Sequence, residues 1–210
     1  MAGPVDHPLF ARFESRLAAL ELRTGGEKLW HELLDGLSGR VVDVGPGSGI
    51  GFAYYPREAT EVLAVEPEAY MRSQAEEAAS KAPAPVRVVD GLADSIPAEN
   101  ASFDAAVTGR VLCSVPDQAA ALAEIRRVLR PGGELRFFEH VVAKKTPLAG
   151  VQRAADRIFW TRAMGGCHTS RDTVRAIEQA GFAIERCRRF SQPPAMFAAP
   201  FVIGTARRTG

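Results

Sequence analysis

With 210 residues and a formal net charge of +1, the chain is long enough for one domain with a sizeable core but offers no electrostatic basis for binding nucleic acid or an acidic membrane. Three scattered cysteines predict neither a disulfide framework nor a metal site, and no window approaches the roughly 18 apolar residues of a membrane-spanning helix. We therefore expect a soluble, cytoplasmic protein with reduced thiols, no metal ion and no nucleic-acid or membrane partner.

Two amphipathic helices are expected within residues 7–37, ahead of the first strand. Their apolar positions recur at the spacing of one helix face: Phe10, Phe13, Leu17 and Leu20, then Leu29, Trp30, Leu33 and Leu34. We expect these helices to pack on the core and to close over a ligand. Residues 1–10 contain Asp6 and two prolines in place of a basic region and an apolar run, so no secretory signal is predicted.

The segment VVDVGPGSG at residues 41–49 predicts a buried strand that runs into a glycine-rich turn. Gly45, Gly47 and Gly49 alternate with other residues, and their lack of side chains lets the backbone approach a ligand closely. A helix is expected from Ile50, and its unpaired N–H groups would face the same place. Asp43 adds a carboxylate just below the turn. The segment predicts a nucleotide-like ligand.

Strands and helices alternate after this turn. Strands are predicted at residues 62–65, 86–89, 103–108 and 135–140, with helices at 68–81 and 117–129. Asp117 suits a helix N-cap, and Pro131-Gly132-Gly133 would end that helix. This alternation predicts a parallel sheet with right-handed crossovers.

The last third of the chain departs from the alternation. Residues 147–166 predict a helical segment, and Ser170 is expected to cap a helix that runs through Ala180. Strands are predicted at residues 182–189 and 201–207. Because a long loop joins them, we expect an antiparallel hairpin that completes the sheet.

The spacing of the turn argues against a dinucleotide. Such sites have a glycine three positions after the second one, where this chain has Ile50. Asp43 would repel a pyrophosphate, whereas a cationic or zwitterionic ligand has no such conflict. Glu66 follows the second predicted strand and can accept hydrogen bonds from both ribose hydroxyls, a feature that dinucleotide sites share.

Four motifs, in order, resemble those of the class I S-adenosylmethionine-dependent methyltransferases: VVDVGPGSG at 41–49, LAVEP at 63–67, SFDAAV at 102–107 and EIRRVLRPGG at 124–133. The last two are similar to the ubiquinone-biosynthesis-like subgroup. A closer resemblance, to the thiol S-methyltransferases of the methyltransferase-like-7 type, rests on VLCSV at 111–115, FEHV at 138–141, Gly166-Cys167 with Arg171, and Gln192 and Pro194 with Pro200 and Gly204. That family has an N-terminal membrane anchor, which this sequence does not predict.

The resemblance implies an α/β fold: a single Rossmann-like class I methyltransferase domain with a mostly parallel seven-stranded sheet and a C-terminal antiparallel hairpin. Its parts would be N-terminal helices at 1–38, a cofactor-binding core at 39–140, a lid or acceptor segment at 141–170, and a closing helix and strands at 171–210. The implied cofactor is S-adenosyl-L-methionine, and the implied product from it is S-adenosyl-L-homocysteine.

A cofactor site follows from the same resemblance. The glycine turn would pass under the methionine and ribose, Asp43 would orient the ammonium group, and Glu66 would bind the ribose diol. Residues 92–94 would surround the adenine, residues 108–109 would offer carbonyls to the ammonium, and Arg110 would pair with the cofactor's carboxylate. The implied set is Asp43, Gly45, Pro46, Gly47, Gly49, Glu66, Pro67, Leu92, Ala93, Asp94, Thr108, Gly109 and Arg110.

Two histidines are candidate catalytic bases. Glu139 and His140 end the fifth predicted strand, and because side chains alternate along a strand, only one should face the site; we favour His140. His168, beside a glycine pair, is the second candidate. Each has a structural alternative, as a satisfied core histidine or as a neighbour of a helix cap. We interpret Cys113 as a small buried apolar residue, and Cys167 as either buried or part of a pocket wall.

The predicted function is methyl transfer to a small, fairly apolar acceptor, with a thiol as one candidate. An apolar acceptor pocket would be formed by Phe159, Trp160, Met196 and Phe197. Two alternatives stay open: O- or N-methylation of a small metabolite, and a protein that binds S-adenosylmethionine without catalysis.

Overall fold

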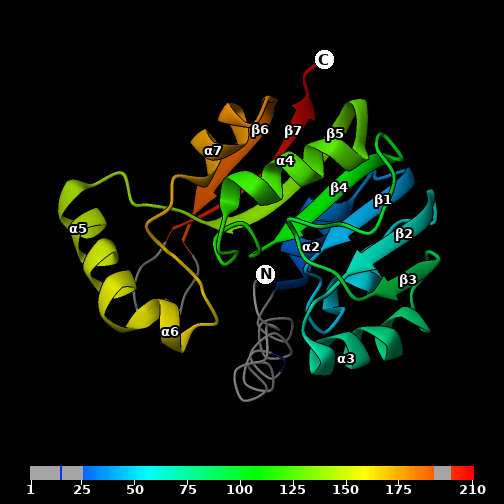
Figure 1. The fold of residues 1–210 in the computed structure, drawn as a ribbon, viewed down its shortest axis with the longest axis horizontal. Coiled ribbons are helices and arrows are strands. Elements are labelled where there is room, and N and C mark those ends of the chain that lie inside the picture. Colours follow the sequence, from blue (N-terminus) through cyan, green and yellow to red (C-terminus); the bar gives the residue numbers. More distant parts are fainter. Residues whose placement is uncertain (1–14, 16–25, 192–199) are drawn as a thin grey trace.

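A computed structural model describes residues 15, 26–191 and 200–210, which form a seven-stranded sheet with helices on both faces (Figure 1). The strand order is β3-β2-β1-β4-β5-β7-β6. The strands are β1 (Gly39–Val44), β2 (Ala59–Val65), β3 (Val86–Val89), β4 (Phe103–Gly109), β5 (Leu129–His140), β6 (Phe182–Phe190) and β7 (Phe201–Arg208). β1 to β5 pair in parallel, whereas β7 is antiparallel to both β5 and β6. The mostly parallel sheet and its closing antiparallel strands are therefore confirmed.

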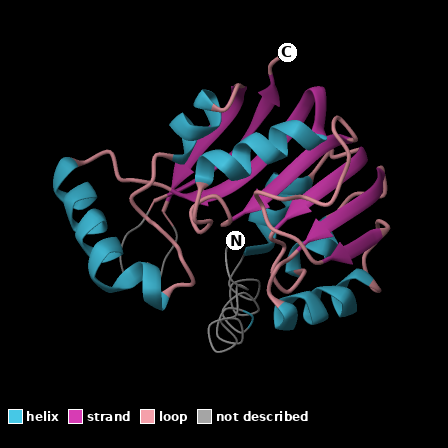
Figure 2. Ribbon diagram, viewed as in Figure 1, coloured by secondary structure: helices cyan, strands magenta, loops and turns pink. Residues whose placement is uncertain are grey.

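Helices pack on the sheet or, between residues 146 and 163, lie to one side of it (Figure 1 and Figure 2). They are α2 (Glu27–Leu34), the 3₁₀ helix η2 (Ile50–Tyr54), α3 (Ala69–Ala79), α4 (Gln118–Val128), α5 (Thr146–Ala155), the π-helical turn η3 (Asp156–Trp160), α6 (Thr161–Ala163) and α7 (Thr173–Gln179). The predicted cap of α4 is confirmed, because the Asp117 carboxylate accepts hydrogen bonds from the N–H groups of Ala119 and Ala120.

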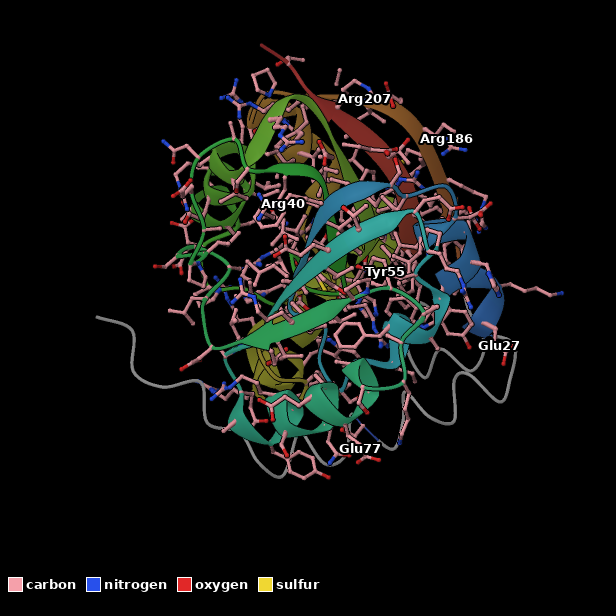
Figure 3. All side chains as sticks on the ribbon, turned by 90° about the vertical axis from the view of Figure 1, so that its right-hand side faces the viewer. Glu27, Arg40, Tyr55, Glu77, Arg186 and Arg207 are labelled. Atoms are coloured by element: carbon pink, nitrogen blue, oxygen red, sulfur yellow. The ribbon has the colours of Figure 1, made fainter. Side chains whose placement is uncertain are left out.

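Each face of the sheet has its own hydrophobic core. On one face, the buried strand residues pack against α4 and α7, through side chains such as Leu122, Ile125 and Ile177. On the other, they pack against α2 and η2, through Leu34 and the fully buried Tyr55 among others. Figure 3 shows Tyr55 inside the molecule, while labelled charged residues such as Glu77 lie at the periphery. The two cores fix the sheet edge at which the strands β1, β4 and β5 end.

The helices expected from Ile50 and over residues 147–166 are present, the first as a 3₁₀ helix and the second with a π-helical turn in its middle. Two other local predictions were wrong in detail. β5 begins at Leu129, so the Pro-Gly-Gly segment lies within this long strand. Ser170 does not cap α7; Asp172 does, because its carboxylate accepts from the N–H of Arg175, while the Ser170 hydroxyl donates to Asp156.

Some predictions concern residues outside the described ranges. Of the two N-terminal helices, the second corresponds to α2, and the first falls among residues that the structure does not describe, apart from Ser15. Gln192, Pro194, Met196 and Phe197 also lie outside the described residues. Within the described ranges, no helix is long and apolar enough to cross a membrane.

Candidate functional site

The glycine-rich turn after β1 has the backbone conformation that its sequence predicts. Gly45, Gly47 and Gly49 have φ angles of 66°, 59° and 74°, in the left-handed region that side chains disfavour. A Cβ at Gly45 would lie 2.6 Å from a methyl carbon of Val111, whereas one at Gly47 would meet nothing within 4 Å. The turn is thus packed on one side and open on the other.

A pocket lies on the open side of this turn. It is lined by Ser15, Trp30, Asp43, Gly45, Pro46, Gly47, Ser48, Ile50, Met71, Gly109 and Arg110. Six of these were predicted cofactor residues, and they come from the ends of β1 and β4. Arg110 has a φ of 65°, a strained conformation for a residue with a side chain, of the kind that clusters at functional sites.

Sequence reasoning missed the aromatic wall of the pocket. Trp30 lies on α2, where the helical spacing of apolar residues assigned it to the core. A Cβ at Gly51 would lie 2.7 Å from the Trp30 ring, and one at Gly109 would lie 3.4 Å from it. The two glycines that admit this ring are the signal that could have identified it. Trp30 brings α2 to the pocket, and closure of this helix over a ligand stays a prediction.

Glu66 fixes the shape of the turn from the end of β2. Its buried carboxylate accepts hydrogen bonds from the N–H of Gly47 and from the N–H of Glu68, each at 3.0 Å. The contact between Glu66 and Gly47 joins the two sequence motifs that were predicted to share a ligand.

Asp43 is a second buried carboxylate, on the floor of the pocket. Burial raises its pKa from 3.8 to about 7; the nearby Glu66 charge adds to this rise, and a hydrogen bond from the Tyr55 hydroxyl, at 2.9 Å, opposes it. Two acids this close to one pocket repel an anionic group. They suit a ligand that carries positive charge.

The remaining predicted cofactor residues do not line the pocket. Gly49 packs against Phe52 and Ala75, and the Pro67 carbonyl accepts a hydrogen bond from Arg72. Thr108 is buried within β4. Leu92, Ala93 and Asp94 lie on the loop after β3, where Leu92 bridges to Ser95 and Asp94 is exposed. Whether these residues contact a cofactor stays a prediction.

The donor set of the pocket fits S-adenosylmethionine better than a dinucleotide. The cofactor carries an ammonium group, with which the Asp43 carboxylate on the pocket floor can pair. A pyrophosphate would meet the same acid and would be repelled. The open space over Gly47 is the place where a ligand can lie against the backbone.

Glu139 and His140, at the end of β5, face different surroundings. Glu139 is fully buried, and its carboxylate accepts hydrogen bonds from the N–H groups of Val111, Leu112 and Cys113 at 3.0–3.1 Å. His140 is half-buried, and its ring lies against Phe201 with centroids 4.1 Å apart. Glu139 therefore fixes the loop after β4 through its backbone N–H groups. The side chain of His140 does not contact these N–H groups and packs against Phe201 instead.

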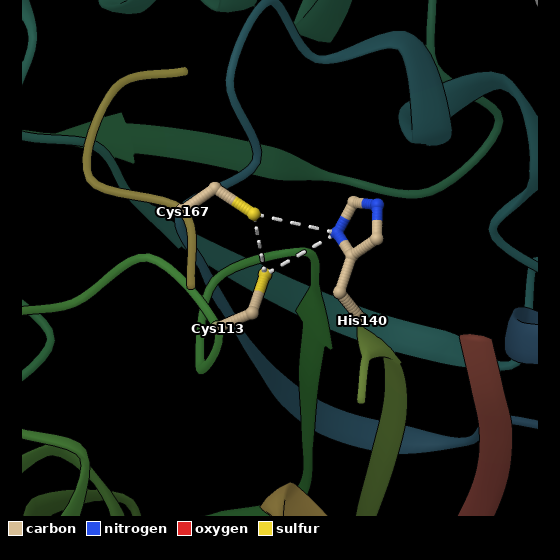
Figure 4. A group of neighbouring side chains, drawn as sticks. All are labelled: Cys113, His140 and Cys167. Carbon is tan, nitrogen blue, oxygen red and sulfur yellow. Dashed lines mark hydrogen bonds between the residues drawn. The ribbon is translucent and has the colours of Figure 1, made fainter. Parts of the chain in front are cut away.

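The imidazole of His140 faces two cysteines (Figure 4). Its Nδ1 lies 3.7 Å from the Sγ of Cys113 and 3.6 Å from the Sγ of Cys167, and the two sulfurs are 3.8 Å apart. The chain positions of the cysteines gave no sign of this cluster. A local signal exists: Gly166 has a φ of 90°, and a Cβ there would lie 2.8 Å from the Ser114 carbonyl oxygen, so this loop approaches the Cys113 loop closely.

His168 lies beside the cluster without joining it. Its backbone N–H donates to the Cys113 carbonyl at 2.7 Å, while its half-buried ring makes no hydrogen bond through Nδ1 to the described residues. The hydrogen bond between the thiols, together with burial, raises the pKa of Cys113; the same bond lowers the pKa of Cys167.

The sequence of the chain is similar to known methyltransferases. Residues 42–137 match the family model described as a methyltransferase domain. The mouse thiol S-methyltransferase TMT1B is 30% identical over 97% of this chain and 87% of its own length. Human TMT1B is 32% identical over 82% of this chain and 73% of its own length.

The fold is shared with solved methyltransferase structures. An S-adenosylmethionine-dependent methyltransferase from Methanosarcina mazei has a TM-score of 0.65 and 21% identity, over 85% of this chain and 96% of that one. Geranyl diphosphate methyltransferase in complex with S-adenosylmethionine has a TM-score of 0.69 and 16% identity, over 98% of this chain and 94% of that one. At these identities the likeness concerns the fold.

Proposed function

The chain belongs to the class I S-adenosylmethionine-dependent methyltransferases, in the family that contains the thiol S-methyltransferase TMT1B, and we propose that its methyl acceptor is a small, fairly apolar thiol. The observation that carries the proposal is the position of His140, Cys113 and Cys167 at the same sheet edge as the cofactor pocket. The TMT1B relatives, as thiol S-methyltransferases, support the same class of acceptor.

The bound cofactor supplies an electrophilic methyl carbon on its sulfonium. In our proposal, Asp43 pairs with the cofactor's ammonium group, Glu66 accepts hydrogen bonds from the ribose hydroxyls, and Arg110 pairs with the carboxylate. Residues 92–94 contact the adenine, and residues 108–109 offer carbonyl oxygens to the ammonium. These contacts hold the methyl group in line with an acceptor, and positioning alone can supply effective molarities of about 10⁵ M or more.

The acceptor side is formed by the ends of β4 and β5 and by the loop that carries Cys167. A thiol with a pKa of about 8.5 is ionised to a few per cent at neutral pH, so a nearby group need only favour the thiolate. His140, with its ring between the cysteines and Phe201, is the group we assign to this role. His168 lies one loop further away and stays a second candidate. The cytoplasmic location stays a prediction from the sequence.

The proposed acceptor class is tested by transfer of labelled methyl groups from S-adenosylmethionine to matched alkyl thiols, phenols and amines. We expect label in thioethers, and we expect His140→Ala to lower turnover by about 10²-fold or more while S-adenosylhomocysteine binds nearly as before. Label confined to ethers or methylamines would discard the thiol and keep the cofactor site. No transfer to any acceptor, with the cofactor still bound, would support the binding protein without catalysis.

Cofactor affinity should depend on the ionisation of Asp43. Its pKa is raised to about 7 by burial, so the carboxylate is neutral below that pH and charged above it. Because the ammonium group pairs with the charged form, the dissociation constant of S-adenosylhomocysteine should rise about tenfold between about pH 8 and about pH 6. Isothermal titration calorimetry across this range measures the effect.

Two variants serve as controls for this pH dependence. Asp43→Asn cannot ionise, so its affinity should be low and flat over the same range. Tyr55→Phe removes a hydrogen bond that lowers the Asp43 pKa, so the midpoint should move to higher pH. A flat profile in the unmodified protein would remove Asp43 from the ammonium site.

A further inference from the structure

Three donor atoms of the kind that bind zinc meet at the edge of the sheet where β4 and β5 end. Cys113 comes from the loop after β4, His140 from the last position of β5, and Cys167 from the loop after α6. In Figure 4, Nδ1 of His140 faces both sulfurs, and the other ring nitrogen points away from them. The three atoms form a triangle with edges of 3.6, 3.7 and 3.8 Å.

This triangle has the dimensions of one face of a zinc tetrahedron. Zinc binds thiolate sulfur at about 2.3 Å and histidine nitrogen at about 2.0–2.1 Å, so tetrahedral geometry places two sulfurs about 3.8 Å apart and a sulfur and a nitrogen about 3.5–3.6 Å apart. We propose that Cys113, His140 and Cys167 bind one zinc(II) ion and leave its fourth coordination position open to the acceptor thiolate. Three protein ligands and one open position are typical of catalytic rather than structural zinc.

The segments that carry the two sulfurs are fixed by buried polar contacts. On the Cys113 side, the Glu139 carboxylate binds three N–H groups of the loop, and the Arg171 guanidinium donates to the carbonyls of Leu112 and Val115. On the Cys167 side, the Asp156 carboxylate accepts from the N–H groups and hydroxyls of Thr169 and Ser170. The donors are therefore held in place before a metal arrives, as metal sites require.

His140 is oriented independently of the cysteines. Its ring packs against Phe201, which pairs with it in register on β7, and its carbonyl accepts a weak hydrogen bond from the Thr173 hydroxyl at 3.4 Å. A disulfide between the cysteines would use two of the three donors and would require the sulfurs to approach to about 2.0 Å. Zinc uses all three donors at the separations they already have.

The open position gives the metal a role in the proposed thiol methylation, and this part of the inference rests on that function. On coordination, the acceptor thiol loses its proton to solvent, and His140 then favours the thiolate as a ligand of the metal rather than as a free base. Its sulfur then forms a bond to the methyl carbon of the cofactor, the sulfonium carbon–sulfur bond breaks, and that electron pair stays on the sulfur of S-adenosylhomocysteine. No oxidant or reductant is needed. The product is a neutral thioether, a weaker ligand than a thiolate, and it can leave.

The site also lies beside the cofactor pocket. Val111, two residues before Cys113, packs against Gly45 of the glycine turn, and Gly109 and Arg110 of the same segment line the pocket. One short stretch of chain thus contacts both the cofactor turn and the proposed metal. A zinc-bound acceptor would be held at the edge of the pocket where the methyl group is transferred.

The test uses the full chain, freed of metal by a chelator under reducing conditions and then titrated with zinc(II) or cobalt(II). We expect one equivalent of zinc to bind with a dissociation constant below about 1 µM, measured by competition with a chromophoric chelator. Cobalt should give the charge-transfer band of two thiolates and the visible bands of a tetrahedral ion. Adding 2-mercaptoethanol should strengthen the charge-transfer band, because a third thiolate enters the open position.

Variants locate the ligands. Zinc binding should weaken by at least about 10²-fold in each of the variants Cys113→Ser, Cys167→Ser and His140→Ala. The control variant Cys187→Ser, which changes an exposed cysteine on β6, should leave zinc binding unchanged. Since a variant can fail to fold, the unmodified protein provides an independent reading: bound zinc should protect Cys113 and Cys167, and not Cys187, from alkylation detected by mass spectrometry.

The outcomes separate this inference from the proposed function. Weak or non-stoichiometric zinc binding, unprotected thiols, or full thiol methylation by the metal-free protein would overturn the metal site and leave the thiol acceptor standing. Zinc binding at these ligands, with label transferred only to phenols or amines, would overturn the thiol acceptor. Metal binding without any response of the cobalt spectrum to 2-mercaptoethanol would refute the open position.

Discussion

Replacing Glu139 with alanine is expected to lower the free energy of unfolding by about 3 kcal/mol or more and to abolish methyl transfer. The carboxylate is fully buried, and it is the acceptor for the N–H groups of Val111, Leu112 and Cys113. Alanine would leave these donors without their acceptor in the interior. The loop they belong to carries a donor of the proposed metal site and part of the cofactor pocket, so stability and activity should fall together. Urea unfolding and initial rates measure the two effects.

Two further variants calibrate this result. Glu185→Ala removes an exposed carboxylate that pairs with Arg207 on the neighbouring strand, and it should cost less than about 1 kcal/mol. Glu139→Gln keeps one acceptor oxygen and a similar shape, so its free energy of unfolding should fall by an intermediate amount. If Glu139→Ala proved as mild as Glu185→Ala, the carboxylate would not be what holds the loop.

The second large effect is expected from Glu66→Ala, which should weaken S-adenosylhomocysteine binding by about 2–4 kcal/mol, or roughly 30- to 1,000-fold. Two losses combine in this variant. The proposed contact with the ribose diol disappears, and the N–H groups of Gly47 and Glu68 lose the acceptor that sets the turn. Calorimetric titration of the purified variant gives the dissociation constant directly.

A matched acid on the same strand controls for this change. Glu61 also lies on β2, but its carboxylate pairs with Arg40, away from the pocket, so Glu61→Ala should bind the cofactor normally. A melting curve of each variant separates lost affinity from lost folding. Unchanged affinity in Glu66→Ala would remove this residue from the site.

Much of the fold could be predicted because its signals are local. The β-branched residues before Gly45 predict a buried strand, the three alternating glycines predict a turn with positive φ, and Asp117 predicts a cap, all from neighbours in the sequence. One error arose where a side chain has a distant partner. Ser170 reads as a helix cap on local grounds, but Asp156 binds its hydroxyl from a turn earlier in the chain.

In the candidate site, too, the parts set by local sequence could be predicted and the parts set by distant contacts could not. The turn and Glu66 could be predicted together, because a known spacing relates them. The contact of Cys113 with Cys167 spans 54 positions and depends on how the segment after β5 folds back, which no periodicity encodes. Alternation along a strand predicted that Glu139 and His140 would face different ways. It could not show that the buried acid would hold the loop that carries a cysteine.

The position of β7 in the sheet affects the order in which the parts of the enzyme fold during synthesis. β6 is made before β7, yet within residues 26–191 and 200–210 its one strand partner in the sheet is β7. During synthesis on the ribosome, the backbone N–H and C=O groups of β6 therefore stay without their strand partner until residues 201–208 have emerged. Phe201 arrives with that strand and completes the packing of His140. The glycine turn and its pocket lie much earlier in the sequence, so a nascent chain can fold its cofactor-binding part well before its acceptor side. The site becomes complete only when β7 inserts between β5 and β6.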